Sequence, residues 1–240
     1  MRIVTFSDIH ANIHALDAVL ADLAQHKADH VVCLGDLVGY GAFPNEVIFR
    51  LRELGVPTIQ GNYDDGVGYD RDDCGCAYRE EEEVQRGQQS LLWHREHVTA
   101  ENKAFLRSLL PRVEYRVGGL HVVLVHGSPR RTNEYLFQDR LESSVIRLMD
   151  MAAADILVCG HTHLPYHRIL SGGRHVINDG SVGKPKDGDP RACYAVIDVD
   201  NGKLRVQFPR VEYDTEAAAR AIEKSGLPAE FAQHIRTGIS

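Results

Sequence analysis

Residues 2–10 read RIVTFSDIH, an apolar run that ends in a serine, an acid and a histidine. We expect a first strand over Arg2–Ser7, followed by an amphipathic helix over Asn12–Gln25 whose apolar residues recur at helical spacing. A strand that leads directly into a helix is the opening of an α/β unit. Side chains two apart in an extended segment point the same way, so Asp8 and His10 are expected to lie together.

The alternation of strand and helix continues downstream. A short apolar strand is predicted at Val31–Leu34, a helix from Pro44 to its stop at Gly55, and a third strand at Val56–Ile59. Residues 61–80 are rich in Gly and Asp and carry little periodicity, which predicts a long loop.

The second half of the chain is rich in predicted strands. The remaining helices are expected at Glu81–His97, Ala100–Leu110, Leu141–Ala153, Thr215–Lys224 and after Pro228. The remaining strands are expected at Val113–Val117, Leu120–Val125, Ile156–Cys159, Tyr166–Leu170, Arg174–Ile177, Cys193–Val199 and Leu204–Val211. This order predicts an α/β (α+β) fold with two packed sheets and helices outside, formed by one domain over residues 1–240.

Composition limits the functional class. Of the 240 residues, 43% are apolar and 25% charged, and the formal charge of −7 argues against nucleic acid as a partner. No apolar stretch approaches the roughly 18 residues that cross a bilayer, and no leader precedes the first strand, so we expect a cytoplasmic protein without a membrane partner. Cys33 and Cys159 lie in apolar runs and are interpreted as core residues, whereas Cys74 and Cys76 form a lone C-x-C of open role.

Polar residues follow five predicted strand ends in succession. They are Asp8, His10, Asp36, Asn62, His126, His161 and His163. Each one alone has an ordinary explanation as a helix cap or a hydrogen-bonded core-edge residue. Open α/β sheets, however, bind ligands beyond the carboxyl ends of their strands, so we expect all seven to converge on one place.

The seven residues offer imidazoles and oxygens but no thiolate, which suits Mn, Fe, Zn, Co or Ni better than Ca or Mg. Seven ligands exceed what a single ion takes from protein. Two divalent transition-metal ions about 3.5–4 Å apart, sharing one carboxylate, would account for all of them.

The motifs D-x-H, G-D, G-N, H-G and G-H-x-H appear here in the order that resembles the calcineurin-like metallophosphoesterases, from Asp8 to about Tyr213. The stretches SDIHANIHAL, GDLVGYGAFPNE, VHGSP, GHTHLP and GSVGKPKDGDPRACYAVID are especially similar to the small bacterial phosphodiesterase-type branch. The resemblance implies a four-layer αββα sandwich of two mixed sheets flanked by helices.

The resemblance also implies a role for each candidate ligand. One ion would be held by Asp8, His10 and His163, the other by Asn62, His126 and His161, with Asp36 bridging the two. Such paired ions lower the pKa of a shared water and give a hydroxide for in-line attack on phosphorus.

Residues 63 and 64 depart from the family pattern. Most members have a substrate-contacting His after the Asn, thought to protonate the leaving oxygen and oriented by the next acid; here Tyr63 and Asp64 stand there. Tyr, with a pKa of about 10, is a poorer acid near neutrality than His. Either the enzyme favours leaving groups that need little protonation, or Tyr63 only shapes the pocket and another group donates the proton.

Two further residues are predicted to contact substrate together with Asn62. Arg130 could bind a phosphate and Tyr40 could stack on a base, although surface packing explains both residues equally well.

The sequence therefore predicts a dinuclear, metal-dependent phosphoesterase that cleaves phosphodiester or phosphoanhydride bonds in small, nucleotide-like substrates, with manganese among the candidate metals. The alternatives are a non-catalytic metal-binding or scaffold protein on the same fold, and a phosphomonoesterase. Nothing in the sequence decides whether the chain forms a homo-oligomer.

Overall fold

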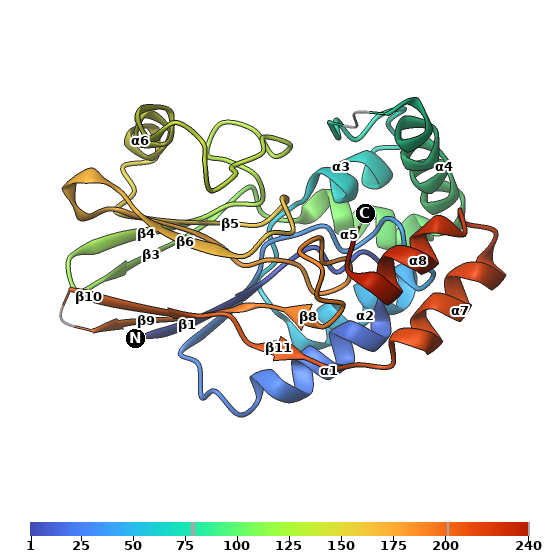
Figure 1. The fold of residues 1–240 in the computed structure, drawn as a ribbon, viewed down its shortest axis with the longest axis horizontal. Helices are drawn as coiled ribbons and strands as arrows, with labels where there is room; N and C mark the ends of the chain where they lie inside the picture. The colour runs from blue at the N-terminus through green and yellow to red at the C-terminus, as the bar shows by residue number, and fades with distance from the viewer. Residues whose placement is uncertain (78–79, 201, 240) are drawn as a thin grey trace.

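The computed structural model describes residues 1–77, 80–200 and 202–239. In this part of the chain two mixed β-sheets pack face to face, with helices on their outer sides (Figure 1). Helix α6 (Glu142–Met151) covers one sheet, and α1 (Ile13–Leu23) covers the other. The predicted four-layer αββα arrangement is confirmed.

The first sheet has the strand order β10-β9-β1-β2. Its strands are β1 (Arg2–Phe6), β2 (His30–Cys33), β9 (Ala195–Asp200) and β10 (Lys203–Gln207). Strand β1 is parallel to β2 and antiparallel to β9, so the chain's first strand lies in the interior of the sheet.

The second sheet has the order β3-β4-β5-β7-β6. Its strands are β3 (Val113–Val117), β4 (Leu120–Leu124), β5 (Ile156–Cys159), β6 (Tyr166–Ile169) and β7 (His175–Asn178). Strands β4, β5 and β7 run parallel, whereas β3 and β6 are antiparallel edges. The carboxyl ends of the parallel strands therefore point to one side of the molecule.

Side chains alternate between two cores along each strand. On β1, Ile3 packs between the sheets, whereas Val4 and Phe6 pack against the helices. On β5, Val158 faces the inter-sheet core and Leu157 faces α6. Burial of each such side chain contributes roughly 1.5–3 kcal/mol, and the period of two fixes which face each strand presents.

The other helices gather at the end of the sheets where the parallel strands finish (Figure 1). They are α2 (Pro44–Leu54), α3 (Asn62–Gly68), α4 (Glu81–His97), α5 (Ala100–Ser108), α7 (Thr215–Ser225) and α8 (Glu230–Thr237). Helix α2 begins at Pro44 and is stopped by the C-cap Gly55, whose φ of 60° is left-handed, as predicted. Within the described ranges, no helix has the length and apolar character that a membrane crossing requires.

The region after α2 differs from the sequence prediction in two ways. Residues 56–59 do not form a strand; the segment makes only isolated bridges from Thr58 to Cys33 and from Ile59 to Leu110. The predicted loop at 61–80 contains α3, and its residues 78 and 79 lie outside the described part.

Helix α3 was missed because glycine is a poor helix former, yet tertiary packing favours it here. A Cβ on Gly66 would lie 3.1 Å from Leu91, and one on Gly68 would lie 3.2 Å from Leu106. Glycine thus lets α3 pack closely against α4 and α5.

Two predicted strands are each divided in the structure. Cys193–Val199 becomes β8 (Ala192–Cys193) and β9, and Leu204–Val211 becomes β10 and β11 (Arg210–Val211). Strands β8 and β11 form a separate two-stranded sheet. Pro209 lacks an amide hydrogen and stands between β10 and β11, where a continuous ladder would need one.

Candidate metal centre

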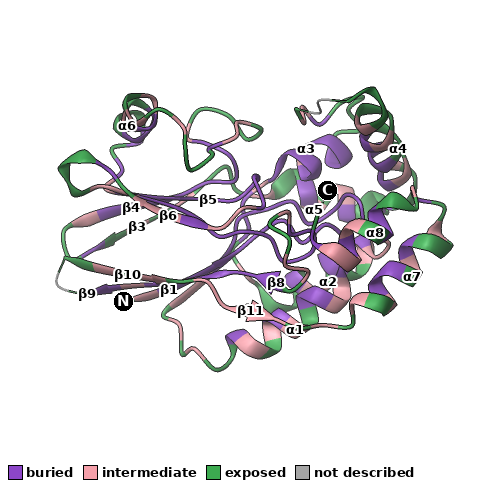
Figure 2. Ribbon diagram, viewed as in Figure 1, coloured by how far each residue is buried: buried purple, intermediate pink, exposed green. Residues whose placement is uncertain are grey.

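Seven buried side chains meet where the parallel strands end. Asp8 and His10 follow β1, Asp36 follows β2, His126 follows β4, and His161 and His163 follow β5, while Asn62 is the first residue of α3. Each is at most 4% exposed. Figure 2 shows that the loops at this end of the sheets are buried although they lie outside regular strands. The sequence correctly predicted that these residues converge.

Backbone strain concentrates at this centre. Five of the seven residues have positive φ although none is glycine: Asp8 (53°), His10 (48°), Asp36 (54°), His161 (65°) and His163 (62°). The left-handed region costs a non-glycine residue on the order of 1 kcal/mol or more. Such strain persists because the surrounding packing holds it, and it aims these side chains inward.

Glycines allow the close approach of neighbouring loops. A Cβ on Gly61 would lie 2.1 Å from Asp36 Oδ1, and one on Gly160 would lie 2.3 Å from Ser7 Oγ and 2.8 Å from Asp8 Oδ2. The glycines that precede Asn62 and His161 are therefore required by the carboxylates packed against them.

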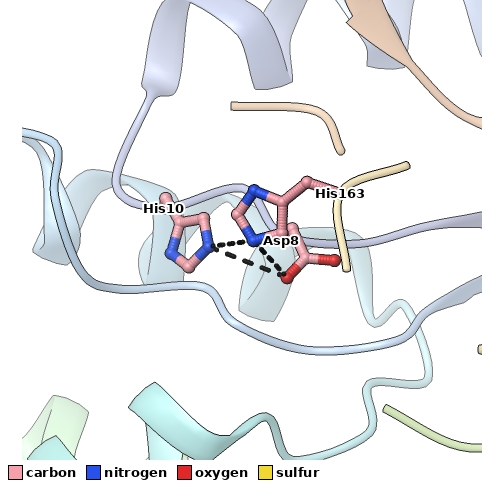
Figure 3. A group of neighbouring side chains, drawn as sticks. All are labelled: Asp8, His10 and His163. Atoms are coloured by element: carbon pink, nitrogen blue, oxygen red, sulfur yellow. Dashed lines mark hydrogen bonds and ion pairs between the residues drawn. The ribbon is translucent and has the colours of Figure 1, made fainter. Parts of the chain in front are cut away.

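The first group of candidate ligands is Asp8, His10 and His163, whose ligand atoms all lie within 4.8 Å of one another (Figure 3). His10 Nδ1 lies 2.9 Å from the Val38 carbonyl and His163 Nδ1 lies 2.5 Å from the Lys184 carbonyl. A carbonyl only accepts, so each Nδ1 carries the hydrogen and each neutral ring presents its Nε2 lone pair. These two Nε2 atoms face each other at 3.2 Å, which is unfavourable unless a cation lies between them.

The second group is Asp36, His126 and His161, with Asn62 beside it. His126 Nδ1 lies 2.9 Å from the Leu34 carbonyl, and its Nε2 lies 3.1 Å from Asn62 Oδ1 and 3.5 Å from Asp36 Oδ2. The Asn62 amide group donates to the Cys74 carbonyl at 3.0 Å, which turns its oxygen toward His126.

Asp36 lies between the two groups. Its Oδ1 accepts the Tyr63 amide at 2.8 Å. Its Oδ2 is 3.5 Å from His126 Nε2 and 3.8 Å from His10 Nε2. Asp36 Oδ2 therefore faces a histidine of each group, and the bridging role stays a prediction.

The donor set fits divalent transition-metal ions. Among the described residues, Asp8 Oδ1 and His161 Nε2 are buried side-chain atoms without a hydrogen-bond partner. Both belong to the two groups, and buried polar atoms normally have partners. Imidazole nitrogens with carboxylate and amide oxygens are ligands typical of Mn, Fe, Zn, Co and Ni.

Electrostatics keep most of the imidazoles neutral. Burial lowers the pKa of His10, His161 and His163, so their nitrogens are free to bind a cation at neutral pH. Burial alone would raise the pKa of Asp8, but the imidazoles around it, His163 foremost, lower it.

His126 differs from the other histidines. Burial would lower its pKa, but the adjacent Asp36 carboxylate outweighs burial and raises the pKa to about 10. In the metal-free protein this imidazole therefore holds a proton between Asp36 and Asn62.

Asp64 supports the loop that carries Asp36. Its oxygens accept the amides of Asp36 at 2.8 Å, Leu37 at 2.8 Å and Gly61 at 2.9 Å. Burial and the nearby Asp36 charge raise the pKa of Asp64 to about 7. These contacts position a candidate ligand; a catalytic role for Asp64 beside Tyr63 stays a prediction.

A second support was not found from the sequence. Ser7 Oγ lies 2.5 Å from Asp8 Oδ2 and 2.7 Å from Oδ1 of the buried Asp179. One hydroxyl has one proton to donate, so one of the two carboxyls must itself carry a proton. Burial raises the pKa of Asp179 to about 8, which identifies it as the protonated partner.

Tyr63 and Tyr40 lie against the first group. Tyr63 is 1% exposed, and its ring is edge-on to His10 at 5.6 Å between centroids. The Tyr40 ring is edge-on to His10 at 4.8 Å and lines a cavity of about 460 Å³ beside the centre. Arg130 is not among the residues described as lining this cavity, and its guanidinium binds Glu134 at 2.5 Å, so its contact with substrate stays a prediction.

The C-x-C pair also lies at the centre. Asn62 Nδ2 is 3.3 Å from Cys76 Sγ, and the Cys74 and Cys76 sulfurs are 3.2 Å apart. All five cysteines are free thiols. The sequence showed the pair but not its contact with a candidate ligand, because that contact depends on how α3 folds.

The family model for the calcineurin-like phosphoesterase superfamily domain matches residues 1–202 of this chain. The chain belongs to this superfamily. It is 33% identical to the uncharacterized protein MJ0912 of Methanocaldococcus jannaschii, with 98% of each chain covered. It is 28% identical to Phosphodiesterase YfcE of Escherichia coli K12, covering 83% of this chain and 89% of that protein.

Among solved structures, a metallophosphoesterase from Sphaerobacter thermophilus matches with a TM-score of 0.79 and 32% identity, covering 100% of this chain and 99% of that chain. The predicted family is confirmed, and with it the class of metal-dependent phosphoester hydrolases. The match at 1–202 includes every candidate ligand and ends before α7 and α8.

Proposed function

We propose that this enzyme cleaves phosphodiester or phosphoanhydride bonds in small, nucleotide-like molecules at a dinuclear centre. The observation that carries the proposal is the pair of adjacent ligand groups, with Asp36 Oδ2 within 3.8 Å of a histidine in each, and buried ligand atoms that no described residue hydrogen-bonds. The phosphodiesterase named among the relatives supports the reaction class.

Each group would hold one divalent cation. Asp8, His10 and His163 are proposed for the first, Asn62, His126 and His161 for the second, and Asp36 for both. When bound, such ions lower the pKa of water and offset charge on phosphoryl oxygens. The manganese ion is our first choice of probe because the nitrogen and oxygen ligand set includes no thiolate.

The protein's own residues position the substrate. Asp64 and the Ser7–Asp179 pair fix the two carboxylates, so little reorganisation is needed when charge develops on the phosphoryl group. Tyr63 is held against both groups by its ring and its amide. Because a tyrosine is a weak acid near neutrality, we propose that the enzyme favours leaving groups that need little protonation.

We also propose that the protein works in the cytoplasm. Its five cysteines are free, and four of them are buried, which suits a reducing compartment.

The test uses the chelator-stripped chain reloaded with Mn²⁺, Ni²⁺ or Zn²⁺. We expect about two ions per chain and hydrolysis of bis(4-nitrophenyl) phosphate that depends on loading. His161→Ala should lower both readouts, whereas His167→Ala, on the edge strand β6, should change neither. Metal binding without hydrolysis of any ester would favour the scaffold alternative, and hydrolysis of 4-nitrophenyl phosphate alone would favour a phosphomonoesterase.

A further inference from the structure

A basic cavity of about 460 Å³ adjoins the first ligand group. Its lining includes Lys184, Lys186, Arg86 and His234, with Glu83 as the acidic residue among those described. The surplus of cations contrasts with the chain's formal charge of −7. A local basic surface on an acidic protein indicates an anionic ligand.

The cavity and the candidate metal centre share backbone and side chains. The Lys184 carbonyl accepts from His163 Nδ1, and Thr162, which lines the cavity, stands between His161 and His163 in the chain. The Tyr40 ring contacts both His10 and the Lys184 ammonium, whose nitrogen lies 4.6 Å from the ring centroid. A molecule that reaches the centre through this cavity therefore passes the two lysines.

Lys184 is 4% exposed, and among the described residues neither it nor Lys186 forms an ion pair with a carboxylate. A buried ammonium is costly without a counter-charge. His234 responds to the same charges: burial and the charges of Lys184, Arg86 and Lys186 lower its pKa to about 4, and its buried Nδ1 has no hydrogen-bond partner among the described residues. An anionic group bound here would offset the charges of Lys184 and Lys186.

The lining also includes aromatic side chains. Phe137 is 42% exposed and stacks on Tyr135 with ring planes 10° apart, and Phe231 of α8 completes the lining. Exposed aromatic rings beside a cationic wall suit a planar base attached to phosphate.

Resting on the proposed function, we infer that the cavity binds a second phosphate and its nucleoside, so that the substrates are nucleoside polyphosphates or dinucleotides joined through a phosphoanhydride. Hydrolysis adds one water across the P–O–P bridge. The OH joins the attacked phosphorus, the bridging oxygen leaves with the second phosphate, and the remaining proton goes to solvent or that phosphate. Lys184 and Lys186 would offset the charge on the departing phosphate, which explains why a strong proton donor is not required at position 63.

The experiment compares two probes by titration calorimetry on the Mn²⁺-loaded full chain, at fixed free Mn²⁺. One probe is α,β-methylene-ADP, which cannot be cleaved at the anhydride; the other is AMP, which lacks the second phosphate. We expect the wild type to bind the diphosphate analogue at least about tenfold more tightly than AMP, because its second phosphate gains a charge-assisted hydrogen bond. Lys186→Gln should reduce this ratio to about one, and Arg86→Gln should reduce it severalfold.

Lys203→Gln, exposed on β10, is the matched control and should keep the wild-type ratio. The inference is overturned if the wild type binds both probes with equal affinity. It is also overturned if folded Lys186→Gln keeps the wild-type ratio of affinities for α,β-methylene-ADP and AMP. Should Lys186→Gln fail to fold, Arg86→Gln on α4 decides alone. Because binding is measured without turnover, failure to hydrolyse bis(4-nitrophenyl) phosphate would overturn the proposed function separately.

Discussion

The two groups of candidate ligands are built from the same residue types but hold protons differently. In the first group, His10 and His163 have lowered pKa values, and their lone pairs meet at 3.2 Å. In the second, Asp36 raises the pKa of His126 to about 10. The first group is thus poised for a cation, whereas a cation entering the second must displace a proton.

The two groups differ in protonation because the carboxylates of Asp8 and Asp36 point in different directions. The Oδ2 atom of Asp8 contacts the Ser7 hydroxyl and accepts the His161 amide, whereas Oδ1 has no hydrogen-bond partner among the described residues and lies 3.3 Å from His163 Nε2. Asp36 gives Oδ1 to the Tyr63 amide and turns Oδ2 toward both groups. The Asp8 carboxylate thus belongs to the first group alone, whereas the Asp36 carboxylate lies close to both. Substitution of Asp36 should therefore affect both groups.

The largest effect is expected for Asp36→Asn. Removing the shared charge weakens both groups, so we expect the metal content to fall from about two ions to one or fewer. Activity on bis(4-nitrophenyl) phosphate should fall about a thousandfold, the scale of losing an electrostatic contact to the reacting group. Metal analysis after dialysis and steady-state kinetics measure the two effects.

Asp17→Asn is the control for this change, because Asp17 is an exposed residue of α1 that pairs with Arg50. It should retain the wild-type metal content and rate. Two tightly held ions in Asp36→Asn would show that the carboxylate does not couple the groups.

A smaller, substrate-dependent effect is expected at Tyr63, which contacts both groups. If leaving-group protonation limits the rate, Tyr63→His should raise kcat/KM for alkyl diesters about tenfold and change aryl diesters little. The measurement is a series of esters of rising leaving-group pKa, with Tyr63→Phe beside it. A wild-type rate that does not depend on leaving-group pKa would refute the proposed preference.

Proton release should distinguish the two groups directly. At pH 7, Mn²⁺ binding to the second group must displace about one proton from His126, so its affinity should rise up to tenfold per pH unit below about 10. Calorimetry in Tris and in phosphate, buffers with different ionisation enthalpies, measures the released protons. The His126→Gln variant should release no proton on Mn²⁺ binding, whereas the control His14→Gln should release as many as the wild type. Equal proton release from the two variants would contradict the assignment of the proton to His126.

The sequence predicted the positions of the candidate ligands better than the contacts that hold them in place. A strand followed by Asp-x-His, or by Gly-His-x-His, places side chains at a sheet edge by local geometry alone, so Asp8, His10, His161 and His163 could be identified. The order of strands and most helix bounds followed from periodicity for the same reason.

The supporting contacts could not be predicted, because they join segments distant in the chain. Ser7 and Asp179 are 172 positions apart, and the lysines of the basic cavity lie in a stretch that carries the family resemblance but to which the sequence assigned no role. Helix α3 was interpreted as a loop because its glycines are favourable only once α4 and α5 pack against them. Local propensity does not report such packing.

The smallest effect concerns stability and tests the support of the first group. Asp179 ionises near 3.8 when unfolded but at about 8 when folded, so between these pH values the folded state binds more protons. Its contribution is therefore present below pH 4 and is lost as pH rises toward 8, at up to about 1.4 kcal/mol per unit. Asp179→Asn keeps a neutral group beside Ser7 and should remove this slope. Urea unfolding of the metal-free chain at pH 5, 6, 7 and 8 measures it, with Asp17→Asn as control. Parallel pH profiles for wild type and Asp179→Asn would mean that Asp179 is ionised in the folded protein and that the proton lies on Asp8 instead.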